Sequence, residues 1–102
     1  MNETGTVNMV MKQAWEEFPI GIDFASEMAE GETVSAGLSV AVVDGATVDI
    51  PIVKPNSIVV VDDTILQVTI YGGAIGGRYN INMRAFINDN KKLEDDIILI
   101  VR

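Results

Sequence analysis

The chain has 102 residues, of which 48% are hydrophobic, enough for one domain with a two-layer core. It contains neither cysteine nor histidine, which excludes disulfides, thiol nucleophiles, histidine general bases and the commonest zinc ligands. The formal net charge of −8 argues against binding to the phosphate backbone of nucleic acids. We therefore expect no enzymatic activity, no cofactor and no metal.

Residues 1–15 are expected to form a flexible N-terminal tail, because the first twelve show no clear apolar period. A single β-sandwich domain is expected over residues 16–102. The first ten residues lack the basic and then apolar pattern of a secretory signal. No apolar run approaches the roughly 20 residues of a membrane helix, so we expect no contact with a membrane.

Seven short segments have the pattern of β-strands, and none has the period of an amphipathic helix. The first contains Pro19, which cannot donate a ladder hydrogen bond, so this strand should lie at a sheet edge. Residues 26–30 allow one helical turn, which Gly31 would end. In chain order the seven segments are residues 18–24, 34–42, 48–52, 58–61, 64–71, 79–87 and 97–101.

Short strands separated by regularly spaced turns predict an all-β fold, an antiparallel β-sandwich of about seven strands. Apolar and polar residues alternate in most segments, so one face of each strand should be buried. The expected core comprises Phe18, Ile20, Ile22, Val34, Leu38, Val40, Ile50, Leu66, Val68, Ile70, Tyr79, Ile81, Met83, Ile97 and Leu99.

A glycine-rich segment, residues 72–79, joins two of the expected strands. Two of its glycines have the spacing of a phosphate-binding P-loop. However, Arg78 replaces the lysine, Tyr79 replaces the magnesium-binding hydroxyl residue, and a strand follows in place of a helix. We interpret Tyr79 as a tyrosine corner whose hydroxyl bonds to upstream backbone, with a plain core tyrosine as the alternative. The residues expected to be structural here are Gly72, Gly73, Gly76, Gly77 and Tyr79.

Two acidic patterns have a functional and a simpler interpretation. Asn88-Asp89-Asn90 is similar to part of the cadherin calcium linker, but Phe86 replaces the aspartate that opens that motif, which favours a solvated turn. Adjacent carboxylates on a strand point to opposite faces, so we interpret the remaining acidic clusters as solvated charge and not as catalytic pairs. These clusters are Glu16-Glu17, Asp62-Asp63 and Glu94-Asp95-Asp96.

Charge and hydrophobicity are both unevenly distributed. Residues 13–53 contain eight acids and no base, so one part of the surface should be strongly negative. This charge would favour solubility or docking to a basic partner. Phe86, Ile98 and Ile100 alternate with the expected core residues and should face outward. They would form one contact surface on the carboxy-terminal hairpin, or scattered exposed residues, or a face covered by the folded-back tail.

The chain resembles small proteins encoded in the tail regions of tailed bacteriophages and prophages, over roughly residues 18–102. The second half carries their pattern of a strand, Gly-Gly-x-x-Gly-x-x-Tyr at residues 72–79, a strand, a polar turn and a last strand ending Val-Arg at residues 101–102. In the first half, Ile22-Asp23-Phe24 and residues 29–34 match two further motifs. Residues 85–92 depart from the pattern, because the family usually has a Thr-rich turn there.

The resemblance implies an immunoglobulin-like (fibronectin III-like) fold and a non-enzymatic structural role, as a tail or fibre–tail adaptor component. It implies contacts with other tail proteins or self-association, no small-molecule substrate, and a place in the virion, assembled in the bacterial cytoplasm. The alternative is a bacterial adhesion or carbohydrate-binding module. Sugar-binding modules usually carry aromatic platforms, and this chain has one tryptophan, Trp15, outside the expected sandwich.

Overall fold

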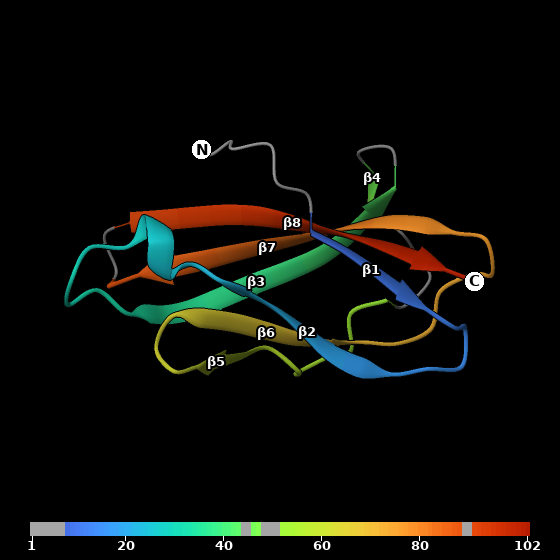
Figure 1. Ribbon diagram of the computed structural model, residues 1–102, viewed down its shortest axis with the longest axis horizontal. Coiled ribbons are helices and arrows are strands. Elements are labelled where there is room, and N and C mark those ends of the chain that lie inside the picture. Colours follow the sequence, from blue (N-terminus) through green and yellow to red (C-terminus); the bar gives the residue numbers. More distant parts are fainter. Residues whose placement is uncertain (1–7, 44–45, 48–51, 89–90) are drawn as a thin grey trace.

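The protein is described by a computed structural model, which places residues 8–43, 46–47, 52–88 and 91–102; for residues 38–43 and 46–47 only the backbone is described. Two sheets face each other (Figure 1). One has the strand order β1-β8-β7-β3-β4, the other β2-β6-β5. The elements are β1 (Asn8–Lys12), β2 (Phe18–Asp23), the 3₁₀ turn η1 (Ala25–Glu27), β3 (Val34–Val43), β4 (Ala46–Thr47), β5 (Val59–Val61), β6 (Ile65–Ile70), β7 (Arg78–Ile87) and β8 (Lys91–Val101).

The expected all-β sandwich is confirmed. Every strand pair is antiparallel except β1 and β8, which run parallel. β2 lies at an edge of its sheet, as Pro19 predicts, because proline has no N–H for a second neighbour. Among the described residues, no helix is long and apolar enough to cross a membrane.

The core lies between the sheets and contains most of the expected residues. Eleven of the fifteen are buried, and Phe18 is half-buried against them. The side chains of Leu38, Val40 and Ile50 lie outside the described part of the structure. Five further apolar residues of the expected alternating strands are also buried: Phe24, Ile52, Ala85, Ile87 and Val101.

A β-bulge in β3 changes which residues face the core. The register between β3 and β7 shifts between Val34 and Ala36. Val34 is buried as expected, but Ala36 is exposed and Gly37 faces the second sheet, where an added Cβ would clash with Leu66. The strict alternation expected over residues 34–42 is therefore wrong at its start, because a bulge inserts one residue and inverts the face of those that follow.

The expected flexible tail is also partly wrong, because residues 8–12 form β1. β1 pairs with the last five residues of β8, and the Arg102 amide donates to the Lys12 carbonyl at 2.9 Å. Residues 1–7 lie outside the described part. Residues 48–51 of the expected third strand also lie outside the described part. Val53, just after that segment, forms an isolated bridge to Ile70.

Candidate interaction surface

The outward face of the β1–β8–β7 sheet carries a compact apolar patch. Ile98 is paired with Met9 on one side and Asn80 on the other, and Ile100 is paired with Met11 and Arg78. Met9 and Met11 are each about half exposed, at 48% and 50%. We call Met9, Met11, Ile98 and Ile100 the β1–β8 patch. Ile98 and Ile100 were predicted to face outward, whereas both methionines fell within the expected tail and were missed.

Phe86 lies on the same face but not in the β1–β8 patch. It stands opposite Lys92, whose Nζ lies 5.8 Å from the centre of the phenyl ring. It lies six positions along β7 from Asn80, the partner of Ile98, which corresponds to about 20 Å along a strand. The structure therefore does not bring Phe86, Ile98 and Ile100 together as one patch.

Polar side chains fill the space between Phe86 and the β1–β8 patch. The Asn82 amide donates to Glu94 Oε2 at 2.7 Å and to Asp96 Oδ1 at 2.9 Å, and Arg84 Nε donates to Glu94 at 3.1 Å. The bonds from Asn82 and then Arg84 lower the pKa of the Glu94 carboxyl. These acids, interpreted above as solvated charge, hold a polar ladder across the two strands.

The glycine segment is bonded to its surroundings through its backbone. The Ala74 amide donates to the Tyr79 hydroxyl at 2.9 Å, the upstream bond that a tyrosine corner requires. Gly76 donates to the Val101 carbonyl at 2.8 Å, and Gly77 donates to Ala74 at 2.8 Å. Because these amides already have acceptors, they are not free to hold a phosphate as a P-loop would.

The backbone or the surroundings explain why glycine occupies these positions. Gly72, Gly73 and Gly76 have positive φ, which residues other than glycine rarely adopt. At Gly77 an added Cβ would lie 2.6 Å from the Tyr79 hydroxyl oxygen, so the tyrosine ring could not keep its place.

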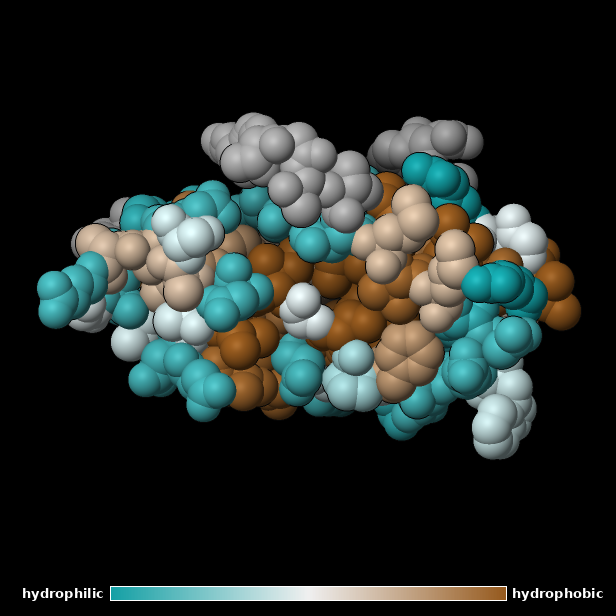
Figure 2. Space-filling view, viewed as in Figure 1, coloured by the Kyte–Doolittle hydropathy of each residue, from teal (hydrophilic) through white to brown (hydrophobic). Residues whose placement is uncertain are grey.

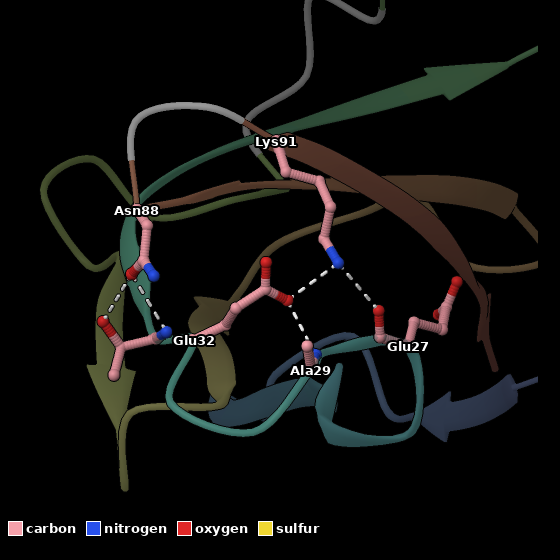
Figure 3. Close-up of polar contacts among 6 residues, drawn as sticks. Glu27, Ala29, Glu32, Asn88 and Lys91 are labelled. Atoms are coloured by element: carbon pink, nitrogen blue, oxygen red, sulfur yellow. Dashed lines mark hydrogen bonds and ion pairs between the residues drawn. The ribbon is translucent and has the colours of Figure 1, made fainter.

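The opposite end of the sandwich is held by side chains (Figure 3). Lys91 Nζ donates to Glu32 Oε1 at 2.8 Å and to the Glu27 carbonyl at 3.1 Å, and Glu32 also accepts from the Ala29 amide. The bond from Lys91, and next the bond from Ala29, lower the pKa of the Glu32 carboxyl. These contacts connect the η1–β3 loop to the β7–β8 turn.

Asn88, the described residue of the expected Asn-Asp-Asn turn, belongs to the same end. Its Oδ1 accepts from both the amide and the hydroxyl of Thr33, each at 3.1 Å (Figure 3). Asp89 and Asn90 lie outside the described residues. Among those described, no group of three or more acidic side chains is arranged to hold a metal ion.

The described acids of residues 13–53 do not share one surface, and Asp44 and Asp49 lie outside the described residues. Glu16 and Glu17 lie in the β1–β2 turn, and Glu17 forms a 2.7 Å ion pair with Lys54. Asp23 and the glutamates of the η1–β3 loop lie at the end held by Lys91. In the view of Figure 2, hydrophobic side chains gather in the middle of the molecule, with hydrophilic ones around them.

The fold and the sequence were compared with known proteins. The solved structure titled "Crystal structure of titin M3 domain" matches with a TM-score of 0.52 and 11% identity, over 94% of this chain and 88% of that one. At this identity the match concerns the fold alone and supports the immunoglobulin-like architecture. No curated protein sequence matches this chain.

A family model does match. Its description is "Podophage GP4 fiber-tail adaptor protein gp77", and it covers residues 12–100, which include β2 to β7 and all of β8 but its last residue. The match spans both halves of the chain, including the glycine segment with Tyr79 and most of β8. This protein is therefore a member of the podophage fibre–tail adaptor family.

Proposed function

We propose that this protein is a structural component of a phage tail, assembled into the virion in the bacterial cytoplasm, and that it works by contacts with other tail proteins and not by catalysis. The observation that carries the proposal is the β1–β8 patch on a member of an adaptor family. An adaptor must offer a surface to each protein that it joins, and this patch is apolar and accessible.

The chemistry of the patch suits a protein partner. Met9 and Met11 are flexible and polarisable, so they adapt to an apolar surface. Ile98 and Ile100 lie between them and β7 on paired strands, which fixes their positions. Charged and amide side chains border the patch, as in the polar rim of protein interfaces.

The proposal is tested with the purified products of the neighbouring genes, each immobilised in turn and exposed to this protein. The double substitution Ile98→Thr with Ile100→Thr keeps β propensity and removes apolar area. We expect at least one neighbouring product to bind the wild type, and the double variant to bind it at least about tenfold more weakly.

The matched control is Val59→Thr with Val60→Thr. These two valines are also exposed on a strand, at 47% and 37%, but lie in the other sheet. They should leave the affinity unchanged. If no neighbouring tail product binds the wild type, the proposal is wrong; if both double variants bind as the wild type does, the contact lies elsewhere.

A further inference from the structure

We propose that the β1–β2 turn presents Trp15 as the anchor of a second docking surface, which inserts into an apolar pocket bordered by carboxylates on a protein partner. This inference rests on the proposed function, since it gives the adaptor a contact besides the β1–β8 patch. Trp15 is 93% exposed. A tryptophan exposed to this degree has no role in the fold, and buried tryptophans are among the commonest hot spots of interfaces.

The turn that carries Trp15 is held by bonds on both sides of it. The Gln13 amide donates to Glu16 Oε1 at 2.6 Å, and the Glu16 amide donates to the Gln13 carbonyl at 3.0 Å. Ala14 packs against the core, and the ion pair of Glu17 with Lys54 holds the turn where β2 begins. An anchor held in place before binding loses little conformational entropy on docking.

A buried lysine completes this arrangement. Lys12, the last residue of β1, is 2% exposed, and its Nζ donates to the carbonyls of Gln13 at 2.9 Å and Ala14 at 3.0 Å. Desolvation by burial lowers the pKa of this amine. Burying a lysine is costly, and here its charge is used to fix the two carbonyls that precede Trp15.

Further apolar area lies at the same end of the molecule. The C-terminal end of β8 bonds to both neighbouring loops: Arg102 to Lys12 beside the turn, and Val101 to Gly76 and Gly77 of the glycine segment. The β1–β2 turn and the glycine segment therefore flank the same strand end, as Figure 1 shows at the right of the view. Ile75, in the glycine segment, is 78% exposed.

The charges at this end indicate the chemistry of the partner. Neither Arg78 nor Arg102 forms an ion pair with any residue that the structure describes, although Arg102 donates to the Met11 sulfur. Glu17 is paired with Lys54, and the Glu16 carboxylate accepts from the Gln13 amide. Arg78 is paired with Ile100 and Arg102 donates to Met11, so both guanidinium groups lie where the β1–β8 patch meets this end. Two such unpaired cations fit carboxylates at the rim of an apolar pocket. A second copy of this chain is a poorer occupant, because its net charge of −8 makes copies repel one another.

The test uses the single tryptophan of the chain. Protein grown with fluorotryptophan gives one fluorine NMR signal, from Trp15, and the probe is the unlabelled neighbouring-gene product that binds the wild type. We expect binding to shift or broaden this signal. Trp15→Ala should weaken the affinity by at least about tenfold, whereas the control Val59→Ala should not. Arg78→Glu with Arg102→Glu should weaken it as well.

Other outcomes separate the two proposals. Binding that leaves the fluorine signal and the Trp15→Ala affinity unchanged would overturn this inference and leave the proposed function intact. A signal that shifts with the concentration of this protein alone would point to a second copy, and one that shifts with anionic phospholipid vesicles would point to a membrane; either would overturn the inference. Unchanged affinity after both arginines are reversed would overturn the carboxylate rim. If no neighbouring product binds the wild type, the proposed function fails first.

Discussion

Two loops at opposite ends of the sandwich, the glycine segment and the η1–β3 loop, are closed by different kinds of bond. In the glycine segment, backbone groups bond to backbone or to the Tyr79 hydroxyl, and no charged side chain takes part in those bonds. At the other end, the η1–β3 loop is held by the carboxylate of Glu32, the amine of Lys91 and the amide of Asn88. The first kind of closure depends on steric fit, and the second depends on charge.

This difference determines how each end should respond to change. Backbone hydrogen bonds in a closely packed loop do not titrate. However, such a loop has no room for an added atom where glycine contacts a ring, as Gly77 contacts Tyr79. Half-buried ion pairs such as Lys91–Glu32 tolerate substitution better than a closely packed loop, but they respond to pH. The glycine segment, which carries Ile75, should therefore keep its shape under conditions that loosen the η1–β3 loop.

The largest expected effect is at Gly77. In Gly77→Ala the new methyl group would displace the Tyr79 ring and break its bond to Ala74, so we expect a loss of about 2–4 kcal/mol of unfolding free energy. Gly76→Ala is the control: its φ of 85° is strained for alanine, but no atom lies within 4 Å, and it should cost about 1–2 kcal/mol. Chemical denaturation measures both; equal losses would contradict the steric account.

A smaller effect is expected at Tyr79. Tyr79→Phe keeps the ring and removes the acceptor of the Ala74 amide, which should cost about 1–3 kcal/mol. Urea denaturation with an unchanged slope gives this value from the midpoint. Tyr71→Phe is the matched control, because the Tyr71 side chain forms no hydrogen bond with any described residue. Equal midpoints for wild type and Tyr79→Phe would show that the corner does not stabilise the fold.

The smallest effect is the acid response of the charged end. The pKa of Glu32 is lowered in the fold, so its contribution to stability is complete above its ordinary value of 4.5 and is lost as the pH falls through the lowered value. Between about pH 5 and pH 3 the Ala29 amide signal should move, while that of Ala74 stays still. Glu32→Gln should abolish the Ala29 response. Movement of both amides together would contradict the comparison.

Much of the sandwich can be predicted from alternation, because a strand with one buried face must place its apolar residues at every second position. This holds for β6 and β7, whose inward residues were all expected to be apolar. β1 could not be found in this way, because Met9, Val10 and Met11 are apolar on both faces and their partner, β8, lies at the other end of the sequence. The bulge in β3 likewise has no local signal that we identified.

The interaction surface was predicted only in part for the same reason. Alternation shows that Phe86, Ile98 and Ile100 share an outward face, but it does not give their distance along the sheet. That distance depends on the register of β7 with β8, which places the Asn82–Asp96 and Arg84–Glu94 pairs between them. Both methionines of the β1–β8 patch come from a strand that the sequence pattern does not reveal.

The most direct test of a structural role in the tail is cryo-electron microscopy of assembled particles from the phage or prophage that encodes this chain. The account predicts density for this sandwich within the tail, with Met9, Met11, Ile98 and Ile100 buried against a neighbouring tail protein. Particles that lack the chain, or that contain it with the β1–β8 patch open to solvent, would contradict the account.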